Sequence, residues 1–290
     1  MKPEVVVDEV CELGEGPLWN PVERRLYWVD YMRGRIYCFD PATGTHEKLY
    51  DGDRVASFTF QSDGTLLLFM DGPSVVLWRD GELRHVIEGI QGEEDNHFND
   101  TISDYTGRVF CGTVPNDLDR ATEGLGSLYR LDIDGSITRI LDGIQCSNGL
   151  GFSPDHKQMY YTDSTARKIY VFDYDEQFGE ISNQQVFVDT AEEEGLPDGM
   201  TVDSEGCLWS ARWDASAVVR YNPEGVEILR YRFSAMKVSS VTFGGDDYRD
   251  IYLTSAGGND RSVEGDDAGA LFRLRTEVKG VPEYYSHIGL

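Results

Sequence analysis

A pattern of short apolar strands returns every 40–50 residues along this chain of 290 residues. Six runs share the pattern, each after a polar or turn-forming stretch, and their starts lie 40, 43, 50, 49 and 43 residues apart: LYWVD (26–30), LLLFM (66–70), VFCGT (109–113), MYYTD (159–163), LWSAR (208–212) and IYLTS (251–255). A further apolar run such as RIYCFD (35–40) follows each of them, and most units end with a fourth. Such runs between turn-forming residues are typical of an all-β protein.

The length of this unit indicates the architecture. Four strands in 40–50 residues match one blade of a β-propeller, whereas a solenoid of such units would need polar caps at both ends. No such caps are visible, so the sequence predicts a six-bladed β-propeller with four antiparallel strands per blade, as a single domain over residues 1–290. We expect the N-terminal segment VVVDEVCE (5–12) to supply the outer strand of the last blade, after ALFRLR (270–275).

The composition restricts the partners. Asp and Glu number 52 against 26 Lys and Arg, a formal charge of −26, which disfavours nucleic acid and anionic membranes as partners. No apolar run approaches the ~20 residues of a membrane helix, and the start MKPEVVVDEV does not resemble a signal peptide. We therefore expect a cytoplasmic protein, a monomer or weak oligomer, whose five cysteines are reduced core residues (Cys11, Cys38, Cys111, Cys146 and Cys207). Only six of the basic residues are lysine, a balance typical of salt-adapted proteins and of acidic mesophilic proteins alike.

Alignment of the six inner strands places one residue of each at the mouth of the propeller axis. Four of the six carry a carboxylate or carboxamide oxygen, and the set is Glu15, Ala56, Asn99, Asn148, Asp198 and Ser239. Glycine follows in three blades (Gly16, Gly149 and Gly199), where it would let the backbone approach the axis closely. Taken singly, Asn-Gly and Asp-Gly pairs are common turn dipeptides. Their coincidence at one repeat position favours a shared function.

Converging carboxylate and carboxamide oxygens indicate a metal site. Without a counter-charge such groups would raise one another's pKa values, and a divalent cation resolves the conflict. All-oxygen ligation suits Ca²⁺, Mg²⁺ or Mn²⁺, and the absence of His and Cys from the column disfavours structural zinc. We predict one divalent cation (Ca²⁺, Mg²⁺, Mn²⁺ or Zn²⁺) on Glu15, Asn148 and Asp198, with positions left for water and substrate.

Long loops are expected to surround this mouth, since loops before inner strands and after second strands lie at the same end of a blade. The longest are 88–98, 114–126, 190–197 and 256–269. Long loops on a rigid scaffold usually carry recognition. The rim residues are His97, Asn99, Asp100, Arg120, Glu123, Asp163 and Trp213. Arg120 and Glu123 also match an exposed loop ion pair.

Several motifs resemble one known family in its order along nearly the whole chain. They are LGEGPLW (13–19), FND (98–100), DYTGRVFCGT (104–113), SNGLGFSPD (147–155), YYTDS (160–164), PDGMTVDSEGCLW (197–209) and FGG (243–245). The chain thereby resembles the senescence-marker/gluconolactonase/luciferin-regenerating family, which includes regucalcin.

The resemblance implies a six-bladed propeller that hydrolyses sugar lactones with one divalent metal on its axis. The family's ligands in GEGP, SNG and PDG fall on Glu15, Asn148 and Asp198, and its substrate-contacting Asn falls on Asn99, followed by Asp100. Two positions depart from the pattern. Many aldonolactonases carry Arg where this chain has His97, and the family's loop Glu aligns with Thr122, one step before Glu123. Both departures concern the substrate rather than the metal.

The resulting hypothesis is an enzyme of carbohydrate metabolism, a lactonase that converts a sugar lactone, such as gluconolactone or a pentonolactone, to the aldonic acid. The metal would polarise the carbonyl, and Asp198 would activate the attacking water. Asn99, His97, Asp100 and Glu123 would contact the substrate. Three alternatives remain open: a non-catalytic, calcium-binding regucalcin-like regulator, a hydrolase of a non-sugar lactone or ester, and a propeller used as an interaction scaffold.

Overall fold

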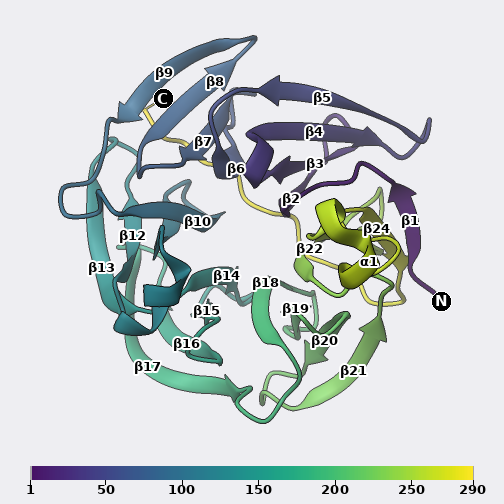
Figure 1. Ribbon diagram of the computed structural model, residues 1–290. Coiled ribbons are helices and arrows are strands. Elements are labelled where there is room, and N and C mark those ends of the chain that lie inside the picture. The colour runs from purple at the N-terminus through teal and green to yellow at the C-terminus, as the bar shows by residue number, and fades with distance from the viewer. Residues whose placement is uncertain (1, 290) are drawn as a thin grey trace. The chain divides into compact units, whose positions relative to one another are not determined.

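The computed structural model describes residues 2–289 and consists almost entirely of strands. Its 24 strands form six four-stranded antiparallel sheets, each a blade, and short helices occur only in connections within the described part (Figure 1). The predicted six-bladed β-propeller with four strands per blade is confirmed. The short apolar runs form strands because their β-branched and aromatic side chains pack on both faces of each sheet.

Contacts between Cα atoms divide the chain into two compact units, each of which is described by itself. Unit 1 comprises the chain up to Arg54 and residues Thr190–Pro282, and unit 2 comprises Val55–Asp189 and the chain from Glu283 on. Each unit contains three blades. The single domain expected from the sequence stays a prediction.

Unit 1 contains blades 1, 5 and 6. Blade 1 comprises β2 (Gly14–Asn20), β3 (Arg25–Asp30), β4 (Arg35–Asp40) and β5 (Thr45–Asp51). Blade 5 comprises β18 (Leu196–Val202), β19 (Leu208–Trp213), β20 (Ala217–Tyr221) and β21 (Glu227–Arg232). Blade 6 comprises β22 (Val238–Gly244), β23 (Asp250–Ser255), β24 (Leu271–Arg275) and β1 (Glu4–Val7). The pairing of β1 with β24 confirms that the N-terminal segment supplies the outer strand of blade 6.

The blades of unit 1 meet through large side chains. β22 contacts both β2 and β18. Trp19 and Tyr252 stack in the apolar cluster shared by blades 1 and 6, and Trp209 packs edge-on against Phe243 in the cluster shared by blades 5 and 6. These clusters bury the second face of each sheet, so almost every residue of the inner strands is buried.

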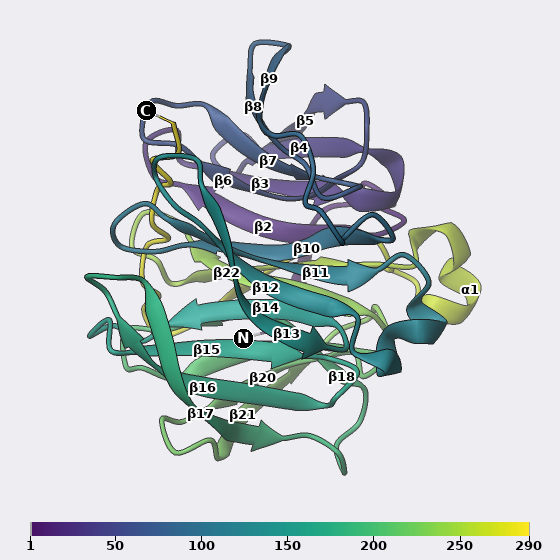
Figure 2. The same ribbon diagram turned by 90° about the vertical axis from the view of Figure 1, so that its left-hand side faces the viewer.

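Unit 2 contains blades 2, 3 and 4. Blade 2 comprises β6 (Val55–Phe60), β7 (Leu66–Met70), β8 (Val75–Arg79) and β9 (Glu82–Ile87). Blade 3 comprises β10 (Asn96–Ser103), β11 (Val109–Pro115), β12 (Gly126–Leu131) and β13 (Ile137–Ile144). Blade 4 comprises β14 (Ser147–Phe152), β15 (Gln158–Asp163), β16 (Lys168–Asp175) and β17 (Glu180–Asp189). β10 contacts both β6 and β14. Figure 2 shows the four strands of blade 4 side by side in their order along the chain, from β14 to β17.

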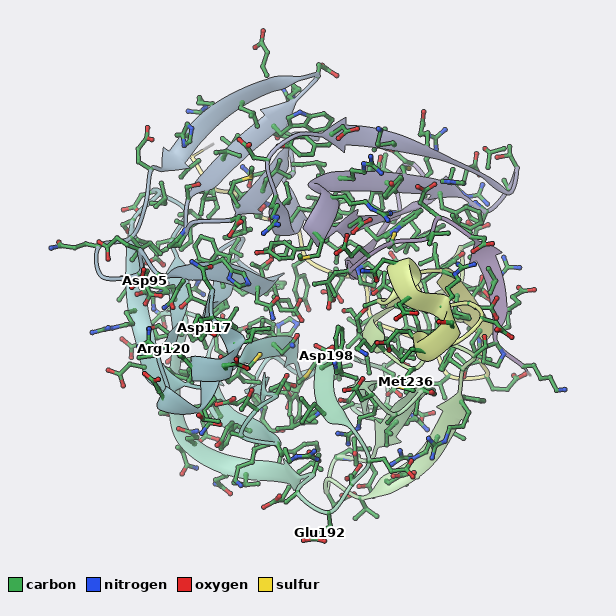
Figure 3. All side chains as sticks on the ribbon, in the orientation of Figure 1. Asp95, Asp117, Arg120, Glu192, Asp198 and Met236 are labelled. Carbon is green, nitrogen blue, oxygen red and sulfur yellow. The ribbon has the colours of Figure 1, made fainter. Side chains whose placement is uncertain are left out.

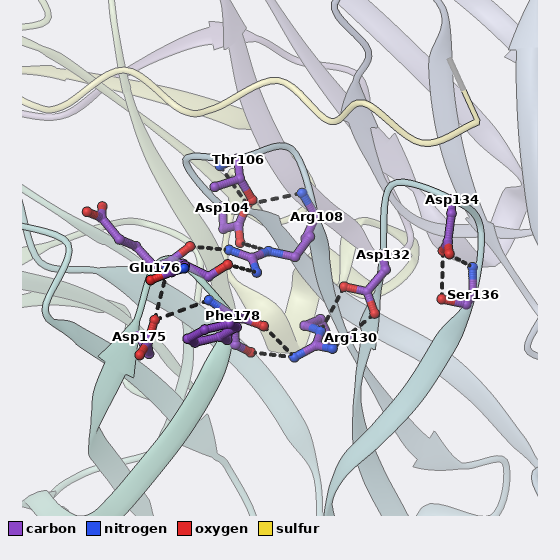
Figure 4. A network of polar contacts seen from close by, with 12 residues as sticks. Asp104, Thr106, Arg108, Arg130, Asp132, Asp134, Ser136, Asp175, Glu176 and Phe178 are labelled. Atoms are coloured by element: carbon purple, nitrogen blue, oxygen red, sulfur yellow. Dashed lines mark hydrogen bonds and ion pairs between the residues drawn. The ribbon is translucent and has the colours of Figure 1, made fainter.

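Two arginines of blade 3 hold the turn between β16 and β17 of blade 4 (Figure 4). Arg108, bound through Nε to the buried Asp104 at 2.6 Å, donates to the carbonyl of Gln177 at 3.3 Å. Arg130 donates to the carbonyls of Phe178 at 2.9 Å and Gly179 at 3.0 Å. These bonds satisfy turn carbonyls and tie the two blades together.

The C-terminal segment crosses unit 2 in an extended conformation. The Ser286 amide donates to the Phe60 carbonyl at 2.8 Å. The Gln61 side chain is fully buried. Its Nε2 donates to the main-chain carbonyl of Ile288 at 2.8 Å, and its Oε1 accepts from the main-chain amide of Ile288 at 2.8 Å. The segment therefore fixes the end of the blade 2 inner strand.

The cysteines agree with the composition. All five are free thiols, four of them buried, and Cys146 is partly exposed. No helix in the described chain has the length and apolar character needed to cross a membrane.

Gly199 allows the inner strands of blades 5 and 6 to approach each other. A Cβ atom at this position would lie 2.2 Å from Ser240 Oγ and 2.8 Å from Ser240 Cα, which is backbone and cannot rotate away. Gly199→Ala is therefore expected to destabilise the protein by about 1–3 kcal/mol, measured as a lower midpoint of urea unfolding. Gly89→Ala is the matched control, because a Cβ there meets nothing within 4 Å. Equal midpoints for both variants would contradict the close packing.

Candidate functional site

In blades 2 to 6 the inner strand interrupts its regular pairing at the residue that the repeat alignment singled out, whereas in blade 1 Glu15 still pairs with Val29 and the interruption follows directly after it. The register with the second strand shifts between Glu15 and Leu18 in blade 1, and the corresponding shifts span Ala56, Asn99, Asn148, Asp198 and Ser239 in blades 2 to 6. A β-bulge inserts an unpaired residue and redirects its side chain, and bulges are frequent beside active sites. Five residues of the aligned column therefore lie within a bulge, and Glu15 is the last paired residue before one.

Unit 1 contributes two carboxylates at this position. Glu15 is 8% exposed and Asp198 is 4% exposed, and both of their strands contact β22 (Figure 3 labels Asp198). Ser239 of β22 is fully buried and donates from Oγ to the Gly14 carbonyl at 2.6 Å. Ser239 therefore links the inner strands of blades 6 and 1 immediately beside Glu15.

Unit 2 contributes two carboxamides, on strands that are joined to each other. The Asn99 side chain donates from Nδ2 to the Ser147 main-chain carbonyl at 2.7 Å. The main-chain carbonyl of Asn99 accepts from Ser57 Oγ, also at 2.7 Å. Asn148 follows Ser147 and is 7% exposed. The Asn99 amide is thereby oriented, with Oδ1 left as its acceptor.

Asp100 lies in the same bulge as Asn99 and is buried. Burial raises the pKa of its carboxyl group to about 7. The cause is desolvation, which penalises the charged form. The sequence indicated Asp100 as a rim residue and substrate contact, and it did not predict the burial, because burial depends on contacts that the local pattern does not contain.

His97 and Glu123 have partners on the loop that follows β11. His97 Nδ1 lies 2.9 Å from Asn116 Oδ1. Glu123 ends the 3₁₀ helix η2 (Leu118–Glu123) and forms a half-exposed ion pair of 2.9 Å with Arg120, whose hydrogen bonds lower its pKa. This is the loop pair that the sequence allowed as an alternative. Substrate contact by either residue stays a prediction.

Asp163 has a backbone partner that explains its burial. Its carboxylate accepts from the amides of Gln145 at 3.1 Å and Cys146 at 2.9 Å, which lead into β14. The Asp30 carboxylate likewise accepts from the main-chain amide of Leu13 at 3.1 Å, one residue before β2 begins. Both aspartates end the second strand of their blades, so comparison of the repeats LYWVD and MYYTD could have revealed this structural role. Desolvation raises the pKa of Asp163.

Trp213, the remaining rim residue, lies in unit 1 beside a charged cluster. Lys237 Nζ sits 5.4 Å from the centroid of the Trp213 ring and 3.1 Å from Asp214. Lys237 also pairs with Glu264 of α1 (Arg261–Glu264), within the loop 256–269. The cluster ties this rim loop to the start of β22.

A second acidic group of unit 1 has the spacing of a metal site. Oxygen or sulfur atoms of Asp203, Glu205 and Cys207 lie within 4.8 Å of one another. Arg220 donates to Asp203 at 2.8 Å and to Glu205 at 2.6 Å. The guanidinium already supplies the positive charge there, so this cluster is a structural ion pair.

The residues predicted as metal ligands have side chains of the kind that divalent cations bind. Glu15, Asn148 and Asp198 offer only oxygen donors, and all three side chains are buried. Hard oxygen donors are the ligands that Ca²⁺ and Mg²⁺ prefer, so the residues present fit such an ion.

Asp100 makes stability depend on pH. In the folded protein the pKa of Asp100 is about 7, which lies above the ordinary 3.8. Between pH 3.8 and pH 7 the folded protein therefore holds a proton that the unfolded chain has released. The free energy of unfolding consequently falls as the pH rises through this range. In metal-free protein, Asp100→Asn should therefore gain about 2 kcal/mol relative to wild type between pH 5 and pH 8, measured by urea unfolding. A difference between the two proteins that does not change with pH would contradict the raised pKa.

Known proteins with similar sequences share this organisation. The family model for the SMP-30/Gluconolactonase/LRE-like region matches residues 13–257. The chain is 45% identical over 293 residues to the pentonolactonase XacC of Haloferax volcanii, and 34% identical over 292 residues to regucalcin of Gallus gallus, with 98% of each chain covered in both cases.

A solved structure agrees with these relatives. The calcium-binding protein regucalcin of Agrobacterium tumefaciens superposes with a TM-score of 0.90 at 26% identity, covering 97% of this chain and 96% of its own. The match to the family model and the similarity to these relatives show that the chain belongs to the SMP-30/gluconolactonase/LRE-like family.

Proposed function

We propose that this protein is a metal-dependent lactonase that hydrolyses a sugar lactone to the corresponding aldonic acid. One observation carries the proposal: Glu15, Asn148 and Asp198 are buried oxygen donors, of which Asn148 and Asp198 lie in the bulge of their inner strand and Glu15 directly precedes it. The pentonolactonase XacC, 45% identical over nearly the full length of both chains, supports a pentonolactone or a related aldonolactone as substrate.

Glu15, Asn148 and Asp198 would hold the divalent cation. When bound, such an ion acts as a Lewis acid toward a carbonyl oxygen and lowers the pKa of bound water. Ca²⁺ is the first candidate because the Agrobacterium relative is described as a calcium-binding regucalcin. Mg²⁺, Mn²⁺ and Zn²⁺ remain to be compared with it.

Asp198 is the candidate general base. Its carboxylate would accept a proton from the attacking water as the new C–O bond forms at the lactone carbonyl, and the proton would then pass to the ring oxygen as the ring C–O bond breaks. The products are one carboxylic acid and one hydroxyl group on the same sugar chain. A positioned base of this kind contributes about 10²–10⁴-fold to the rate.

The substrate contacts are proposed on unit 2. Asn99 Oδ1 is an acceptor for a sugar hydroxyl, since Nδ2 is bound to the Ser147 carbonyl. His97 and Asp100 flank Asn99 along β10. Glu123 would reach a substrate only by exchanging its ion pair with Arg120.

Regulation by calcium binding without catalysis is the second candidate. The 34% identity to regucalcin of Gallus gallus favours it, because the same three ligands would serve a regulator. Turnover separates the two functions.

Metal-stripped protein is expected to release no acid from fresh xylono-, arabinono-, galactono- or gluconolactone above the spontaneous rate, and to gain turnover when Ca²⁺, Mg²⁺, Mn²⁺ or Zn²⁺ is added. Acid release is followed with a pH indicator. Tight cation binding, measured by calorimetry, without turnover on any lactone would favour the regulator.

Asp198→Asn is expected to lower kcat by at least about 100-fold and to weaken metal binding, because it removes a ligand charge and the base. Asp53→Asn removes a carboxylate from an exposed loop of the same unit and should behave as wild type. Near-normal turnover of Asp198→Asn at saturating metal would exclude Asp198 as the base.

A further inference from the structure

A buried carboxylate in front of β10 has no part in the proposed chemistry. Glu93 is 3% exposed and lies in the loop that leads into β10. Its Oε2 accepts from Asn96 Nδ2 at 2.6 Å and from Thr113 Oγ1 at 2.7 Å, and its Oε1 accepts from Tyr129 OH at 2.7 Å. The three donors are neutral, and bonds to an ionised acceptor are roughly twice as strong as bonds between neutral groups.

These bonds join the two loops that carry the predicted substrate contacts of unit 2. Asn96 Nδ2 also donates to the Leu125 carbonyl at 2.9 Å, at the far end of the loop 114–126. At the near end of that loop, the main-chain amide of Asn116 donates to the main-chain carbonyl of Asp95 at 2.9 Å. Figure 3 labels Asp95, Asp117 and Arg120 on these loops. Glu93 thus fastens the segment before β10 to the second and third strands of its blade.

The connection continues to His97. Asn116 places Oδ1 within 2.9 Å of His97 Nδ1, two residues before Asn99. Displacement of the Glu93 loop would move the His97–Asn116 pair, because both Asp95 and Asn96 are bound to the loop that contains Asn116. The Glu93 carboxylate therefore acts on His97, a predicted substrate contact, indirectly through Asn96 and the loop 114–126.

Blade 5 of unit 1 repeats this construction independently. Glu193 lies in the loop that leads into β18, accepts from Arg212 Nη2 at 2.7 Å, and accepts from Tyr221 OH at 3.0 Å. In both blades the glutamate precedes the inner strand and binds one group of the second strand and a tyrosine of the third. Along the chain, Glu193 precedes Asp198 of blade 5, whereas Glu93 precedes Asn99 of blade 3.

We infer that Glu93 is a positioning residue for substrate binding: its carboxylate holds the loop 114–126 and the His97–Asn116 pair in the conformation that receives the lactone. The inference rests on the proposed function. Because Glu93 lies in blade 3 and touches none of the proposed metal ligands, its loss should weaken substrate binding and spare metal binding.

Steady-state kinetics on the best lactone test this role in Glu93→Ala and Glu93→Gln. We expect KM to rise about tenfold or more in Glu93→Ala with kcat within about threefold, because the misplaced loop costs substrate binding. Glu93→Gln keeps the shape and one acceptor oxygen, so it should recover part of the loss. The matched control is Glu94→Gln, which changes the exposed neighbour and should leave KM unchanged.

Metal affinity gives the discriminating contrast. Calorimetry with Ca²⁺ should give Glu93→Gln and wild type the same Kd, whereas Glu193→Gln in blade 5 should weaken Ca²⁺ binding through the loop before Asp198. Unchanged KM in a folded Glu93 variant, or equal losses in KM, kcat and metal affinity, would overturn the positioning role. If Glu93→Ala does not fold, Glu93→Gln and Tyr129→Phe decide.

Amide hydrogen exchange keeps the test independent of turnover. The loop 114–126 should exchange faster in Glu93→Gln than in Glu94→Gln, and equal protection in both would overturn the inference. If wild type shows no lactone turnover, the proposed function fails. Faster exchange in Glu93→Gln would then still show that the carboxylate holds the loop.

Discussion

The site of this protein depends on one interruption of β pairing, repeated in every blade. Regular antiparallel pairing would direct successive side chains to alternate faces of the sheet, and the bulge releases one residue from that alternation. The bulge tolerates different side chains because its residue is outside the ladder. Ala56 and Ser239 occupy it in blades 2 and 6, and Asn148 and Asp198 bring oxygen donors to it in blades 4 and 5, whereas Glu15 directly precedes it in blade 1.

Polar side chains on buried inner strands require fixed partners, and these partners also make the site rigid. In unit 2, Ser57 binds the Asn99 carbonyl and Asn99 binds the Ser147 carbonyl, so three neighbouring inner strands are joined at the level of the bulge. In unit 1, Ser239 binds the Gly14 carbonyl beside Glu15. Such second contacts hold functional groups within the small tolerances that binding and catalysis require.

The repeat predicts the blades and the strand order because both are local and recur six times. It cannot predict which loop carboxylates are buried. Glu93 and Glu94 are adjacent and chemically identical, yet Glu93 binds Thr113 and Tyr129 whereas Glu94 is exposed. The difference arises from residues 20 and 36 positions away along the chain. The metal ligands and substrate contacts proposed from the sequence stay predictions.

Substrate choice can vary in this architecture without changing the proposed metal ligands, because the two sets of residues lie on different elements. The proposed ligands lie in or directly before bulges of inner strands, whereas His97 is paired with a residue of a loop that Glu93 holds in place. Arginine offers only donors to a sugar, while the neighbouring imidazole and carboxamide of His97 and Asn116 offer both donors and acceptors. In the proposed lactonase, a change from arginine to this pair would therefore alter which hydroxyl pattern is bound and would leave the proposed role of Asp198 unchanged.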